Sequence, residues 1–188
     1  MKTAWDSVRI EFDVSIKFSD YKAHLGIPFN NILLKLNIPT KLHYQIKQQY
    51  DKISLTQMNQ IKLYDGVIST LQYLKKNNTA LSILTSKTKN RTKEILSFFE
   101  IDQYFQFVIS PEDLPIHDSK PSPMALKRVL ALFSINPEKL LFIGDMISDK
   151  CCADAAGTAY YHCQYGYQPI ETKNSIFQFE DLKTILNA

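Results

Sequence analysis

The stretch LLFIGDMISDKCCADAAG, residues 140–157, decides the fold class of this chain. It opens as a nearly continuous apolar run that ends on Gly144 and Asp145, and it continues as an alanine-rich segment with helical character. A short apolar run of this kind is typical of a strand buried on both faces, as in a parallel sheet. Asp145 and Asp149 therefore lie at the mouth of a strand, four positions apart.

The same alternation of short apolar runs with amphipathic segments extends from about Leu63 to the end of the chain. Such regular alternation predicts a three-layer, Rossmann-like α/β core with a parallel sheet. The expected strands lie near residues 79–87, 106–110, 140–144 and 158–163, and the expected helices lie at residues 65–78, 88–99, 122–133, 148–157 and 180–186.

The first sixty or so residues have a different texture. Ala4, Val8 and Phe12 repeat at helical spacing, and no β alternation interrupts the pattern. We therefore predict an all-helical subdomain over residues 1–62 and an α/β core over residues 63–188.

Bulk composition excludes several classes of function. The 188 residues are 45% hydrophobic and 22% charged, and the formal net charge of +3 is too small to indicate nucleic-acid binding. No apolar run has the length of a membrane span. The three cysteines include the adjacent pair Cys151 and Cys152, which matches no spaced metal-ligand pattern and fits a reducing, cytoplasmic setting.

Polar side chains follow the expected strands at the edge where ligands bind in such sheets. Thr85, Ser86 and Lys87 follow the first strand, Lys120 comes after the second, and Asp145 with Asp149 follows the third. Carboxylate oxygens are ligands that Mg²⁺ prefers, and a hydroxyl with an ammonium group can hold phosphate oxygens. The combination indicates phosphate chemistry assisted by magnesium.

These motifs resemble those of the haloacid dehalogenase-like hydrolases, most closely the branch of phosphoglycolate phosphatase and β-phosphoglucomutase. LSILTS resembles the second family motif, SKPSPMAL the third and FIGDMISD the fourth. The resemblance implies that Thr85 and Lys120 bind phosphate, that Asp145 and Asp149 bind magnesium, and that a small phosphorylated metabolite is the substrate. It also implies that residues 1–62 form a helical cap, whose LGIPFNN turn brings Asn30 to the substrate.

The chain departs from the family at one point. Family members begin with a strand that ends in Asp-x-Asp-Gly-Thr and supplies the nucleophile, and this segment is absent here. RIEFDVSI is an unconvincing substitute, because no Gly-Thr turn follows Asp13, which we interpret as a helix-end or loop carboxylate. Without that strand, two apolar strands keep unpaired inner edges unless they close onto each other, another segment or chain fills the gap, or the natural polypeptide is longer.

Two functional hypotheses follow. The first is a magnesium-dependent phosphatase at the family level, inactive as written because the nucleophile is missing, and present as a monomer or homodimer. The second is a catalytically dead binding or regulatory remnant with residual phosphate binding, whose magnesium affinity should be poor because part of the metal shell is missing. Purely structural roles remain as alternatives: Thr85 and Ser86 as caps of the next helix, Lys87 and Lys120 as solvated lysines, and Asp145 with Asp149 as the N-cap and first-turn acid of a helix.

Overall fold

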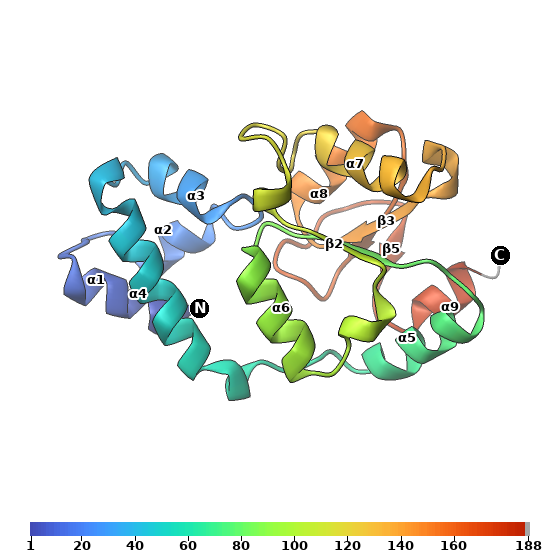
Figure 1. Cartoon of the computed structure of the whole chain (residues 1–188), viewed down its shortest axis with the longest axis horizontal. Helices are drawn as coiled ribbons and strands as arrows, with labels where there is room; N and C mark the ends of the chain where they lie inside the picture. Colours follow the sequence, from blue (N-terminus) through green and yellow to red (C-terminus); the bar gives the residue numbers. More distant parts are fainter. Residues whose placement is uncertain (187–188) are drawn as a thin grey trace. The chain divides into compact units, whose positions relative to one another are not determined.

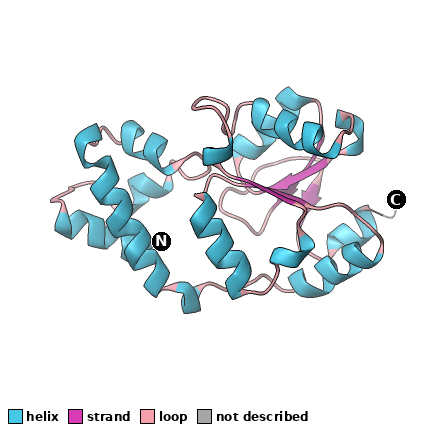
Figure 2. Ribbon diagram, viewed as in Figure 1, coloured by secondary structure: helices cyan, strands magenta, loops and turns pink. Residues whose placement is uncertain are grey.

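A computed structural model describes residues 1–186 of the chain and divides it into two compact units, Met1–Lys62 and Leu63–Ala188. The first unit, all of whose residues are described, is built from helices alone (Figure 2). Its helices are α1 (Lys2–Glu11), α2 (Phe18–Lys22), α3 (Phe29–Lys35) and α4 (His43–Thr56), with short 3₁₀ turns at Thr40–Leu42 and Met58–Gln60.

The first unit has its own apolar core around Trp5. The Trp5 ring is fully buried, stacks on Tyr21 with 4.4 Å between ring centroids, and donates its indole N–H to the carbonyl of Ile16 at 3.1 Å. Asp13 follows the end of α1 with a left-handed backbone (φ 51°). The segment RIEFDVSI therefore completes a helix and a loop and forms no strand, which confirms our interpretation of Asp13.

The second unit alternates strands and helices, as the sequence pattern predicts, and every paired strand is parallel to its neighbour. Among residues 1–186, no helix combines the length and apolar character needed to cross a bilayer. The elements are α5 (Val67–Lys76), β1 (Ser82–Leu84), α6 (Lys89–Phe98), β2 (Phe107–Ile109), α7 (Met124–Phe133), β3 (Leu141–Gly144), α8 (Ile147–Ala156), β4 (Ala159–Cys163), β5 (Ser175–Ile176) and α9 (Asp181–Ile185), with 3₁₀ turns at Asp102–Tyr104, Pro111–Asp113 and Pro137–Lys139.

Side chains of alternate strand residues pack into two apolar layers, one on each face of the strands. Leu84, Phe142 and Tyr160 face a cluster built on α7 and α8, whereas Ile83 and Tyr161 face clusters on the side of α5 and α9. Figure 1 shows α7 and α8 on one side of the strands and α5, α6 and α9 on the other. The predicted three-layer α/β core is confirmed.

The strands form two separate sheets, with the orders β1–β2 and β3–β4–β5. In the described part of the chain, β1 pairs only with β2 and β3 pairs only with β4, so each keeps one free edge. All residues of β1 and β3 are only half-buried, although strands inside a parallel sheet are normally covered on both sides. The two strands therefore do not close onto each other, and that option of the sequence analysis is wrong.

Candidate functional site

Lys120 and Asp149 form a buried ion pair at the carboxyl ends of the strands. Lys120 Nζ lies 2.6 Å from Asp149 Oδ1, and only 9% of the lysine side chain and 4% of the aspartate side chain are exposed. The same ammonium lies 3.5 Å from the carbonyl oxygen of Leu84, the last residue of β1, and 5.9 Å from the centre of the Phe142 ring. The ion pair thus brings a positive charge to the point where β1 and β3 both end.

Asp149 also organises the start of α8. Its Oδ2 accepts the backbone N–H groups of Asp145 and Met146, each at 3.1 Å, so the carboxylate serves as a first-turn cap. Gly144 is required at the end of β3, because a Cβ there would collide with the Asp149 carboxylate. Protein donors engage both oxygens of Asp149, which favours a role in orienting Lys120; direct coordination of a metal by Asp149 stays a prediction.

Asp145 lies in the turn between β3 and α8, held by the loop that follows β4. Its Oδ2 accepts the backbone N–H of Tyr167 at 2.9 Å. Position 166 requires glycine, because a Cβ on that residue would overlap the Asp145 side chain. Met146 is the N-cap residue of α8, so Asp145 is not the helix cap that one alternative assigned to it.

Thr85 follows β1 directly. Its Oγ1 accepts the backbone N–H of Lys87 at 3.1 Å, and a threonine hydroxyl that accepts one bond can still donate its proton to an acceptor such as a phosphate oxygen. The cap of α6 is Thr88, whose side chain accepts the backbone N–H of Arg91. The capping alternative for Thr85 and Ser86 is therefore wrong, and Ser86 lies half-buried beside Thr85.

Lys87 carries the second positive charge near this edge. Much of the residue is exposed to solvent, yet desolvation of the ammonium and the neighbouring Lys120 lower the pKa of Lys87, while Asp145 and Asp149 oppose the shift. A phosphate dianion at this edge would offset the repulsion from Lys120 that helps to lower the pKa of Lys87. The next basic residue, Lys89, is instead paired with Asp113 at 2.6 Å.

The described residues offer magnesium a partial set of ligands. Asp145 can supply Oδ1, because Oδ2 is the atom that binds the Tyr167 N–H. Within residues 1–186, no group of three or more His, Cys, Asp or Glu side chains is placed to hold a metal ion. Magnesium usually keeps several waters and binds one or two carboxylates together with substrate phosphate, so one carboxylate fits part of such a site.

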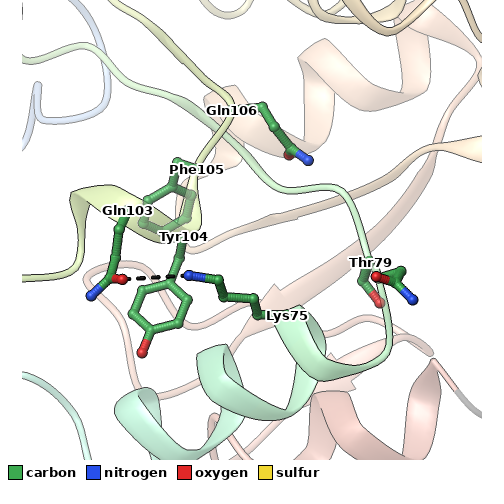
Figure 3. Close-up of a pocket in the computed structure, with 7 residues that line it drawn as sticks. Lys75, Thr79, Gln103, Tyr104, Phe105 and Gln106 are labelled. Carbon is green, nitrogen blue, oxygen red and sulfur yellow. Dashed lines mark hydrogen bonds between the residues drawn. The ribbon is translucent and has the colours of Figure 1, made fainter.

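Two other features concern other parts of the chain. Asn30 is exposed on α3 of the first unit, and its contact with a substrate stays a prediction. A hollow of about 270 Å³ lies at the opposite, amino-terminal ends of β1 and β2 (Figure 3). Its cation, Lys75, is engaged by Gln103 at 3.4 Å and by the Tyr104 ring at 5.3 Å from its centre, so the hollow has no part in the cluster around Lys120.

Comparison with known proteins places the chain among hydrolases. The family model of the haloacid dehalogenase-like hydrolases matches residues 3–162. Phosphoglycolate phosphatase 1 of Pseudomonas aeruginosa is 32% identical over 128 residues, which are 66% of this chain and 46% of that protein. Phosphoglycolate phosphatase of Haemophilus influenzae (strain 86-028NP) is 33% identical over 131 residues, 68% of this chain and 58% of that protein. The matched part thus amounts to about half the length of these relatives.

Solved structures agree on the fold. A Lactobacillus plantarum protein provisionally named a phosphoglycolate phosphatase superposes with a TM-score of 0.85 at 22% identity and covers 98% of this chain and 89% of its own. A hydrolase from Pseudomonas syringae gives a TM-score of 0.83 at 16% identity, with the same coverage of both chains. At such identities the likeness concerns the fold alone.

Proposed function

Because the chain belongs to the haloacid dehalogenase-like hydrolase family, we propose that its second unit is the core of a magnesium-dependent phosphatase for a small phosphorylated metabolite. The observation that carries this proposal is the buried pair of Lys120 and Asp149, which holds an ammonium group beside the end of β1. A buried charge is costly unless it has a use or a partner, and here the partner leaves the ammonium at the edge where ligands bind in such sheets.

Each residue of the cluster has a proposed role. Lys120 holds phosphate oxygens and offsets the negative charge that grows during transfer, while Asp149 keeps the ammonium in place. Thr85 donates its hydroxyl proton to a phosphate oxygen, and Ser86 and Lys87 line the same edge. Asp145 would hold a magnesium ion, whose charge would polarise the phosphoryl group. Asn30, from the first unit, is proposed to contact the rest of the substrate.

The nucleophile is the missing part. In the family it is the first aspartate of Asp-x-Asp-Gly-Thr, and these 188 residues contain no such segment. We propose that the 188-residue chain by itself turns over no phosphate ester above background, and that an attacking carboxylate would have to enter beside Lys120 and Asp145. The second candidate function is a binding or regulatory protein in which the cluster of Thr85, Lys120 and Asp145 binds phosphate without turnover.

The first proposed substrate is phosphoglycolate, because the curated relatives carry the name phosphoglycolate phosphatase. The second proposed class of substrates is sugar phosphates. We propose a cytoplasmic protein that acts as a monomer or homodimer and binds no nucleic acid.

Sequencing the DNA just upstream of the first codon separates the two candidate functions. An in-frame segment that encodes a strand with Asp-x-Asp-Gly-Thr favours the enzyme, and a stop codon favours the remnant.

The decisive assay uses a chain extended by such a strand, tested against phosphoglycolate and a panel of sugar phosphates with and without Mg²⁺. Asp145→Asn should abolish the magnesium-dependent turnover. The matched control is Asp154→Asn, which removes a carboxylate that is 58% exposed on the following helix, α8, and paired with Lys150. Turnover that survives Asp145→Asn would show that the metal ligand is wrongly assigned. Robust activity of the unextended 188-residue chain would show that the nucleophile is wrongly assigned.

A further inference from the structure

A chain of hydrogen bonds runs from the interior of β4 to the loop that follows this strand. Tyr160 and His162 lie two residues apart on one face of β4, and the Tyr160 hydroxyl oxygen is 2.7 Å from His162 Nδ1. The other ring nitrogen, Nε2, lies 2.8 Å from the carbonyl oxygen of Gln168. The His162 side chain is fully buried and 6% of Tyr160 is exposed, so water does not compete for these bonds.

The direction of this chain follows from what each group can donate. A carbonyl oxygen only accepts, so His162 Nε2 carries the proton in its bond to Gln168. In the neutral imidazole, Nδ1 then accepts the proton of the Tyr160 hydroxyl. Burial, followed by the charge of Asp149, raises the pKa of Tyr160, so the hydroxyl keeps its proton and remains a donor.

Gln168 connects this chain to the candidate metal ligand. Its backbone N–H donates to the carbonyl of Asp145 at 3.3 Å, and its side-chain Oε1 accepts the backbone N–H of Ile147 at 3.0 Å. The preceding residue, Tyr167, donates its N–H to Asp145 Oδ2 at 2.9 Å. The loop therefore holds the main chain at Asp145 and Ile147 as well as the Asp145 carboxylate itself.

Two further contacts tighten the same turn. The single proton of the Tyr160 hydroxyl is shared between His162 Nδ1 and, at 3.2 Å, the carbonyl oxygen of Gly144, the residue immediately before Asp145. On the other side, Gly166 allows the loop backbone to approach the Asp145 side chain more closely than any residue with a Cβ could. The orientation of Asp145 is thus fixed by contacts that begin at a buried tyrosine and histidine.

We propose that Tyr160, His162 and Gln168 are positioning residues that hold the Asp145 carboxylate in one orientation for a divalent cation. This inference rests on the proposed role of Asp145 as a metal ligand. A carboxylate that is already oriented loses less conformational freedom when a cation binds, and outer-shell partners of metal ligands typically change metal affinity by about 10- to 100-fold. None of the three side chains is proposed to touch the cation.

The test compares four variants of the 188-residue chain by nuclear magnetic resonance. His162→Leu removes both ring nitrogens, Tyr160→Phe removes one hydroxyl, and His162→Gln restores one donor and one acceptor in a side chain of similar reach. The matched control is Tyr161→Phe, which removes a hydroxyl from the opposite face of β4. Two quantities are measured: hydrogen exchange of the Tyr167 amide, and broadening of the signals around Asp145 by Mn²⁺, an ion that takes the same oxygen ligands as Mg²⁺.

We expect His162→Leu to speed exchange of the Tyr167 amide by about tenfold and to weaken Mn²⁺ binding by about 10-fold or more. Tyr160→Phe should cause a smaller change in the same direction, His162→Gln should recover most of the loss, and Tyr161→Phe should match the unsubstituted chain. A protein that merely needed His162 for folding would show exchange that increases throughout β4, and His162→Gln would not restore it.

The two measurements separate the inference from the function on which it rests. If Mn²⁺ broadens no signal near Asp145 in the unsubstituted chain, the proposed metal site is wrong. If the Tyr167 amide is equally protected in His162→Leu and in the unsubstituted chain, the positioning chain is wrong, whatever Mn²⁺ does. Should His162→Leu fail to fold, Tyr160→Phe decides the same question, because the loss of a single oxygen leaves the packing of β4 intact.

Discussion

The ion pair between Lys120 and Asp149 makes a sharp prediction about stability. Asp149→Asn keeps the size of the side chain, and its remaining oxygen can still accept the N–H groups of Asp145 and Met146. The new amide group, however, would face the Lys120 ammonium, which has only 9% of its side chain exposed. The substitution therefore removes the charge of the partner while leaving the cap of α8 in place.

Removal of one member of a buried pair costs about 3–5 kcal/mol, because the other charge stays buried without compensation. We expect Asp149→Asn to fall in the lower part of that range, since the long lysine side chain can turn partly toward solvent. Lys120→Met should cost less than Asp149→Asn, because the two backbone N–H groups continue to compensate the carboxylate. The double variant should cost clearly less than the sum of the two single variants.

Urea unfolding followed by far-ultraviolet circular dichroism measures these differences. Fluorescence is unsuitable, because the single tryptophan, Trp5, reports only on the first unit. Asp154→Asn on the same helix is the control. The Asp154 side chain is 58% exposed and that of its partner Lys150 is 38% exposed, and such surface ion pairs contribute about 0–1 kcal/mol to the free energy of unfolding. The reasoning is refuted if Asp149→Asn costs no more than Asp154→Asn, or if the two single costs at Lys120 and Asp149 simply add.

Three further predictions concern single residues. Gly166→Ala should lower the free energy of unfolding by about 1–3 kcal/mol through its collision with Asp145; melting curves measure the difference, and an unchanged melting temperature would contradict the close approach. Burial raises the pKa of Cys152 from its ordinary 9.0 to about 11, so at about pH 8 its thiolate fraction should be roughly 100-fold below the ordinary value. Iodoacetamide with mass spectrometry should therefore label the exposed Cys151 long before Cys152, and equal rates would contradict the buried position. Trp5→Ala should destabilise the first unit by about 3–5 kcal/mol, and a red-shifted emission maximum of native Trp5 would contradict its burial.

Much of the fold could be predicted because its signals are local. Apolar runs such as those around Ile83 and Ile143 predict buried strands, and the amphipathic segments between them predict the helices that the structure contains. The two-residue strand β5 escaped prediction, since Ser175 and Ile176 are too short a run to show any period. The separation of the sheet into two parts also needs coordinates, because strand pairing depends on segments far apart in the chain.

The candidate site could be predicted only in part, for a similar reason. Lys120 and Asp149 were each expected near the strand ends, but the sequence gives no sign that they bind one another across 29 positions. The close approach of Gly166 to Asp145 depends on the fold of the loop and leaves no local signal in the sequence. Gln168 and His162 gave no local signal at all, since their importance lies in partners that only the tertiary structure supplies.

The open inner edges of β1 and β3 also bear on how this polypeptide behaves in concentrated solution. Unpaired strand edges are templates for pairing between molecules, and half-exposed apolar side chains beside them strengthen such contacts. A net charge of +3 provides little repulsion against them. Self-association of this chain should therefore grow steeply with protein concentration and temperature, and chaperones that recognise extended apolar segments are its natural competitors.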